Sequence, residues 1–106
     1  MAVDITSANN SPYIKNIASQ GTTWNKVSLP PWAKYITAQG VAAIYVAFHD
    51  ATDAGAVGAT PKASIAAASY HTVRLPVNVR PVGASSKDIY VAAQAGTTDI
   101  TLIVEG

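Results

Sequence analysis

The chain has 106 residues with a formal net charge of +1 and no cysteine; 49% of its residues are hydrophobic and only 12% are charged. This length fits one domain with its own core, and the missing cysteines exclude a disulfide framework and a thiolate zinc site. The near-neutral charge does not indicate nucleic acid or an acidic membrane as a partner, and so few charges favour a surface covered by neighbouring protein.

The first residues, Met1–Ile5, carry an acid where a secretory signal would carry a basic region followed by an apolar run. The longest apolar run in the chain is far shorter than the roughly 20 residues that a membrane helix needs. We therefore expect a protein made in the cytoplasm, without a secretory signal and without a membrane partner.

Residues 1–20 are polar, contain few side chains of core size and are interrupted by the Asn-Asn-Ser-Pro break at residues 9–12. Tyr13, Ile14 and Ile17 suit a short strand or a half-buried segment after that break. We interpret residues 1–20 as an N-terminal arm or loosely packed segment, which either stays loosely tied or docks on a neighbouring subunit. Residues 21–106 then form the folded domain.

Residues 22–29 alternate in polarity and predict a strand that ends at Pro30-Pro31, because proline cannot donate to a strand ladder. Residues 32–37 alternate again and lead to Gly40. The apolar run of residues 41–48 follows after only a tight turn, so we expect it to pair with the preceding strand as a hairpin.

The run Val41–Phe48 is the strand around which we expect the fold to be organised. Eight apolar residues rich in β-branched and aromatic side chains favour a strand that is buried on both faces. Its small face, with Ala43 and Ala47 beside Tyr45, is expected to meet a second layer or a neighbouring subunit. Its large face is expected to fill the core with Ile44, Val46 and Phe48.

Residues 50–61 are rich in glycine, alanine and aspartate and predict a loop. Residues 62–69 are rich in alanine, which favours a short helix, but they carry no capping signal and no helical stripe, so we favour extended structure. Residues 70–79 have a clear period of two and predict a strand in which Pro76 marks an edge or a bulge. Two further strands are predicted over residues 88–93 and 99–104.

These six to eight short strands, with turns about every ten residues, predict an all-β fold: a single-domain antiparallel β-sandwich or a small barrel. Strands do not alternate with helices, so a parallel sheet is not expected.

The sequence offers no constellation that is typical of an enzyme. It has no cysteine nucleophile, no glycine-rich phosphate loop and a single glutamate, Glu105, and its aspartates mostly flank predicted turns. We therefore expect no catalytic residues and no cofactor.

The segment His49-Asp50-Ala51-Thr52-Asp53 is the one local cluster that resembles a site. A metal ion bound by His49 and the two aspartates would need further ligands, such as His71 from another strand or residues from symmetry mates. We favour the simpler interpretation of a strand end followed by a polar loop, without a metal.

Basic and aromatic residues are interleaved in a way that single-strand-binding barrels also use. The basic residues are spread over three predicted strands and form no run, so we do not expect nucleic acid as a partner. The residues concerned are Lys26, Lys34, Arg74 and Arg80, with Trp24, Trp32 and Tyr35.

Trp24 and Trp32 flank the rigid Pro30-Pro31 corner. Core packing is the simpler interpretation of both side chains. The alternative is an exposed aromatic platform for a sugar ring or a partner protein, because tryptophan is enriched at binding hot spots.

Residues 21–33 read Gly-Thr-Thr-Trp-Asn-Lys-Val-Ser-Leu-Pro-Pro-Trp-Ala. This phrase, in which a valine–leucine strand runs into proline and an aromatic residue, resembles small virion proteins of tailed bacteriophages. The closing residues 89–93 and 96–106 have the same character. The resemblance implies a jelly-roll-like β-sandwich that assembles on a phage particle, often as a trimer, and it carries no catalytic residue.

From this resemblance we expect a capsid decoration or cement protein, located in the virion, whose partners are copies of itself and the major capsid protein or other virion proteins. The alternatives are a tail, head-fibre or baseplate component, or a carbohydrate- or receptor-binding module. The residues that we expect at interfaces are Tyr13, Ile14, Ile17, Trp24, Trp32 and Tyr35.

Overall fold

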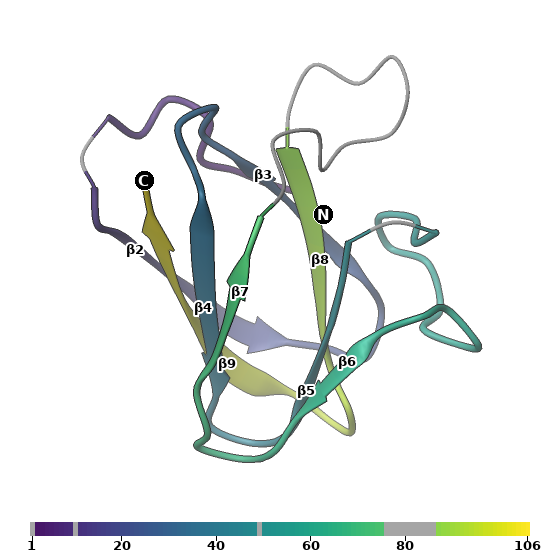
Figure 1. Ribbon diagram of the computed structural model, residues 1–106. Helices are drawn as coiled ribbons and strands as arrows, with labels where there is room; N and C mark the ends of the chain where they lie inside the picture. The colour runs from purple at the N-terminus through teal and green to yellow at the C-terminus, as the bar shows by residue number, and fades with distance from the viewer. Residues whose placement is uncertain (1, 10, 49, 76–86) are drawn as a thin grey trace.

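The computed structural model describes residues 2–9, 11–48, 50–75 and 87–106. Within these residues all regular structure is β-structure, and the strands form two facing sheets (Figure 1). The predicted all-β sandwich is therefore confirmed. The strands are β1 (Val3–Asp4), β2 (Tyr13–Gln20), β3 (Asn25–Leu29), β4 (Tyr35–Gly40), β5 (Ile44–Ala47), β6 (Ala63–Ile65), β7 (His71–Arg74), β8 (Lys87–Ala93) and β9 (Thr98–Glu105).

The strand order gives the sandwich jelly-roll connectivity. One sheet has the order β1-β3-β8-β5-β6 and the other has the order β2-β9-β4-β7. Leaving out the two-residue β1, the strands pair in a nested way, β2 with β9, β3 with β8, β4 with β7 and β5 with β6, and each of these pairs is antiparallel. Eight strands nested in two sheets are the jelly roll. The expectation of a jelly-roll-like topology is thus confirmed.

The core lies between the two sheets and follows from the alternation within the strands. In β9 every second residue is buried, so Ile100, Leu102 and Val104 all point inward. The opposite sheet contributes Val27, Leu29, Ile44, Val46, Ile89 and Val91, each at most 3% exposed. Removing these branched side chains from water is the main favourable contribution to folding.

The predicted hairpin between β4 and β5 is wrong, because these strands belong to different sheets. Instead, residues 41 and 42 form the bend between the sheets, where Val41 N–H donates to the Asp99 carbonyl and Ala42 N–H to the Thr98 hydroxyl. Val41 is 72% exposed as a result. Gly40 permits this bend, because a Cβ atom there would collide with the carbonyl of Ala42 and the side chain of Ile44.

Residues 13–20 are part of the sandwich, whereas the sequence predicted an arm or loosely packed segment over residues 1–20. Tyr13–Gln20 form strand β2, which pairs with β9 from Tyr13 to Ile17 and again at Gln20. Ile17 is buried in the core, and the many polar residues of this segment reflect its position at the edge of the sheet. Even β1 is paired, in parallel with β3.

The extended structure predicted for residues 62–69 is confirmed over Ala63–Ile65, which form β6, whereas residues 67 and 68 form a turn. The strand predicted over residues 70–79 is present as β7 and forms the edge of its sheet. Residues 70 and 75 are described but lie outside the strand, and residues 76–79, including Pro76, lie outside the described residues.

Candidate functional site

The outer face of the β3-β8-β5 region is covered by the chain's own loop, which spans residues 50–61. Trp24, Ala47, Tyr90 and Ala92 form a second apolar cluster on this face, and Ala51 and Val57 of the loop pack against it. The second layer expected beside Ala47 is therefore part of the same chain.

Backbone hydrogen bonds hold this loop to the segment around Trp24. Trp24 N–H donates to the Gly55 carbonyl at 2.8 Å, and Ala54 N–H donates to the Trp24 carbonyl at 2.7 Å. The Asp53 carboxylate also accepts a bond from Lys26 N–H at 3.0 Å. Trp24 is only 1% exposed beneath this cover, so it packs in the interior and offers no platform to a sugar ring.

Tyr90 is the one residue of this cluster with a shifted acidity. Burial raises the pKa of its phenol, and the nearby carboxylates of Asp88 and Asp53 act in the same direction. The phenol therefore stays neutral at physiological pH and has a packing role in the cluster.

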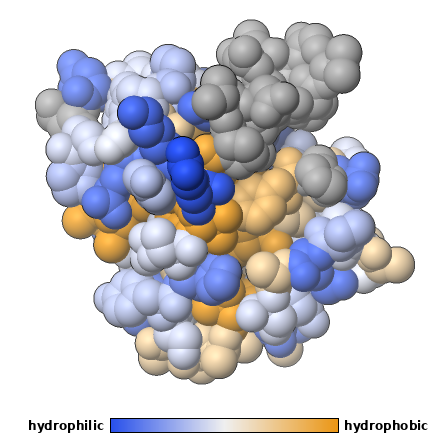
Figure 2. Space-filling view, in the orientation of Figure 1, coloured by the Kyte–Doolittle hydropathy of each residue, from blue (hydrophilic) through white to orange (hydrophobic). Residues whose placement is uncertain are grey.

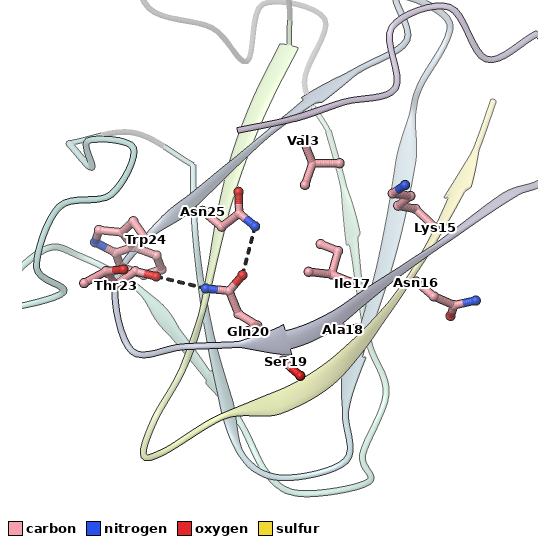
Figure 3. Close-up of a pocket in the computed structure, with 10 residues that line it drawn as sticks. All are labelled: Val3, Lys15, Asn16, Ile17, Ala18, Ser19, Gln20, Thr23, Trp24 and Asn25. Carbon is pink, nitrogen blue, oxygen red and sulfur yellow. Dashed lines mark hydrogen bonds between the residues drawn. The ribbon is translucent and has the colours of Figure 1, made fainter. Parts of the chain in front are cut away.

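A cleft of about 370 Å³ opens between β2 and β3 (Figure 3). Its polar wall is a pair of amides: Asn25 Nδ2 donates to Gln20 Oε1 at 2.9 Å, and Gln20 Nε2 donates to the carbonyls of Gly21 and Thr23. Lys15 is its one charged lining residue. The cleft is lined by Val3, Lys15, Asn16, Ile17, Ala18, Ser19, Gln20, Thr23, Trp24 and Asn25.

This cleft is a poor candidate for a binding site, because its amides already bond to each other. Asn25 Oδ1 has no partner among the described residues, but it is also shielded from solvent, so a ligand could not reach it without a rearrangement. An inward-facing lysine on an edge strand such as β2 also discourages a further strand from pairing there.

A smaller apolar hollow lies at the seam where the edge strand β7 approaches β5 and β6. Figure 2 shows apolar surface at the centre of this view, bordered by hydrophilic patches. The hollow measures only about 10 Å³, so it is a gap in core packing and has no room for a ligand. It is lined by Ile36, Ala38, Val46, Ala63, Ile65, His71, Val73 and Ile89.

The outer face of the β2-β9-β4-β7 sheet is not covered by any described segment, and we refer to it as the bare face. Its residues follow from the strand registers, because directly opposed residues share a face. Three rows cross the sheet: Ile14–Ile103–Thr37–Thr72, Asn16–Thr101–Gln39 and Glu105–Tyr35–Arg74. Eight of these ten residues are uncharged, and the two charged residues lie in one row.

The six residues predicted at interfaces are divided by the structure. Ile14 and Tyr35 lie on the bare face and are 57% and 40% exposed. Ile17 and Trp24 are buried within the chain, so neither is available to a partner in this conformation. Tyr13 and Trp32 are half-buried, and both pack against the main core.

No sequence pattern identified the other bare-face residues as members of one surface. Ile103 and Glu105 lie at the end of the last strand and Arg74 lies in β7, and only the pairing of β4 with both β9 and β7 brings them beside Tyr35. The incorrect β4–β5 hairpin concealed this arrangement.

The metal hypothesis gains no support in the described part of the chain, where no group of three or more histidine and acidic side chains is placed to hold an ion. Asp53 bonds to the Lys26 backbone, and His71 is exposed on β7. His49 lies outside the described residues. The described residues also contain no helix that is long and apolar enough to cross a membrane.

Comparisons with protein-family models, with curated proteins and with solved structures find no match to this chain.

Proposed function

We propose that this protein is a structural component of the virion of a tailed bacteriophage, a decoration or cement protein that stabilises the head through contacts between subunits. The observation that carries the proposal is the bare face, which no described segment covers and which exposes the large side chains of Ile14 and Tyr35. Aromatic residues such as tyrosine are enriched at protein interfaces relative to the rest of the protein surface.

The fold is compatible with this role, since jelly rolls serve as shell proteins, although lectins and cupins share the same architecture. The resemblance of residues 21–33 to small phage virion proteins favours the first of these uses. The mechanism would be mechanical: apolar and strand-face contacts hold neighbouring shell subunits together against internal pressure.

A carbohydrate- or receptor-binding module is the alternative from a different class. Such a module would need Trp24 or Trp32 as an exposed platform on which a sugar ring can stack. Trp24 is buried, and the indole N–H of Trp32 donates to the Ala8 carbonyl at 2.7 Å, so this alternative has lost its main support.

Co-sedimentation with purified phage particles tests the proposal and separates head from tail. The purified protein is mixed with heads and, separately, with tails of the phage that encodes it. Saturable binding to heads at a fixed ratio to the major capsid protein is the expected result. Binding to tails alone would favour a tail or baseplate component, and binding to neither would contradict the proposal.

A further inference from the structure

We propose that two copies of this chain associate through the bare face, across a two-fold axis that runs parallel to β4, midway between the two facing sheets. This inference rests on the proposed function and deepens it, because it names the surface and the first partner used in assembly. The resemblance to phage proteins implies a trimer, whereas the charges on the bare face fit a two-fold pair.

The two charged residues of the three rows are placed symmetrically about β4. Tyr35 on β4 is opposite Glu105 on β9 on one side and opposite Arg74 on β7 on the other. Adjacent strands are about 4.8 Å apart, so the negative and the positive residue are displaced from β4 by equal distances in opposite directions. Rotation by 180° about an axis parallel to β4 and above the bare face places each of these two positions opposite the other in the facing copy.

Two copies related by this axis would meet with complementary charges. Glu105 of each copy would face Arg74 of the other copy, and the two Tyr35 side chains would meet between these pairs. Facing sheets are about 10 Å apart, a spacing that side chains of this length fill. A two-fold interface makes every such contact twice. If the axis lay above β9 instead, Glu105 of one copy would face Glu105 of the other copy.

Several polar groups of the bare face can be buried at low cost because they already have partners. The hydroxyls of Thr37 and Thr72 bond to each other at 2.8 Å, and the Thr101 hydroxyl donates to Asn16 Oδ1 at 3.1 Å. Gln39 Nε2 donates to the Ala68 carbonyl at 3.2 Å. A second copy would therefore remove water from this face without leaving these groups unsatisfied.

One further charge, Asp99, lies beyond these rows at the opposite end of β9. Its carboxylate already accepts a hydrogen bond from the backbone N–H of Ser19 at 2.9 Å. The other sheet is a weaker candidate for this contact, because the loop at residues 50–61 already covers part of its outer face.

Sedimentation equilibrium over a range of concentrations tests the pairing. We expect a reversible species of twice the 10.9 kDa chain mass. Glu105→Arg or Arg74→Glu should weaken it about tenfold or more, because each substitution sets like charges against each other twice. The double variant exchanges the two charges and should recover association to within about threefold of the wild type. Ala59→Glu, which adds a charge to the loop that covers the other sheet, is the matched control and should have no effect.

Crosslinking locates the axis independently. The chain has no cysteine, so a single introduced thiol gives an unambiguous result. With a short bismaleimide, Gln39→Cys on β4 should yield covalent dimers, because residue 39 faces its own copy. Asn16→Cys lies in the same row of the bare face but on β2, two strands from the axis, and should yield few.

A monomer at all concentrations, a trimer, or single charge variants that associate as well as the wild type would overturn this pairing. A double variant that is folded by circular dichroism yet fails to recover association would overturn the axis parallel to β4. Head binding is measured separately, so a monomer that binds heads contradicts only the pairing, whereas a dimer that binds neither heads nor tails contradicts only the proposed function.

Discussion

Asn25 Nδ2 donates a hydrogen bond to Gln20 Oε1 at 2.9 Å, joining the last residue of β2 to the first residue of β3. These two strands belong to different sheets, so the pair of amides fixes the point at which the chain crosses the sandwich. Gln20 Nε2 also donates to the carbonyls of Gly21 and Thr23, which lie in the crossover itself. The buried Gln20 side chain thus accepts one hydrogen bond, from Asn25, and donates to two carbonyls of the crossover.

Gln20→Leu should lower the free energy of unfolding by about 1–3 kcal/mol, because it leaves the Thr23 carbonyl and the Asn25 amide without their partner. Asn9→Leu, at an exposed position, is the control and should change stability by less than about 0.5 kcal/mol. Urea denaturation followed by circular dichroism measures both. Equal midpoints for the two variants would show that the amide pair contributes nothing to the crossover.

Gly40→Ala should destabilise the protein by about 1–3 kcal/mol, because its new methyl group would collide with the Ala42 carbonyl and the Ile44 side chain at the bend between sheets. Gly21→Ala is the matched control. A Cβ atom at Gly21 has no neighbour within 4 Å, so this variant should be neutral or slightly stabilising. The two thermal unfolding curves provide the comparison, and an unchanged Tm for Gly40→Ala would contradict the described bend.

Much of the fold follows from local pattern. The alternation in residues 99–104 places Ile100, Leu102 and Val104 on one face whichever strand lies beside them, and the structure buries all three. The alternation within a strand does not indicate which other strand it pairs with. The nesting of β2 with β9, which brings residues 13 and 104 together, is a long-range property of the whole chain.

The candidate surface was harder to predict for the same reason. Tyr35 is recognisable from sequence as an aromatic residue in an alternating segment, but its neighbours Arg74 and Glu105 are roughly 40 and 70 positions away. The sequence pattern is compatible with either a buried or an exposed Trp24, and it is the loop at residues 50–61 that covers this side chain. Local pattern therefore predicts which residues alternate, and only the strand order determines which of them form a surface.

Trp24→Ala should cost about 3–5 kcal/mol, since it empties the centre of the cluster beneath that loop. Titration of a Trp32→Phe variant with simple sugars should leave its tryptophan fluorescence unchanged, because the one remaining tryptophan, Trp24, is covered. Chemical denaturation and fluorescence titration measure the two effects. A stability loss below about 1 kcal/mol, or a saturable response to a sugar, would contradict the buried role of this side chain.

Thr6 should control the acidity of Asp4. The Thr6 hydroxyl and the Thr6 backbone N–H donate to Asp4 Oδ1 at 2.6 and 2.9 Å, and these bonds hold the pKa of Asp4 below 3.8. Because the folded state favours the carboxylate, its contribution to stability is present above that pH and is lost as the pH falls through the lower folded-state pKa.

Thr6→Val removes the hydroxyl bond and should raise the pKa of Asp4 towards 3.8, whereas Thr6→Ser keeps the hydroxyl and should leave it low. Carboxyl chemical shifts followed by NMR during an acid titration report this pKa directly. The same pKa in both variants would mean that the hydroxyl does not stabilise the carboxylate.

The most direct test of a structural role in the virion is the thermal stability of phage heads with and without this protein. Calorimetry of purified heads that lack the protein, to which the purified chain is added back, should show the head transition rising in temperature and then levelling off at a fixed stoichiometry. A head transition that does not move at saturating protein would contradict a decoration role.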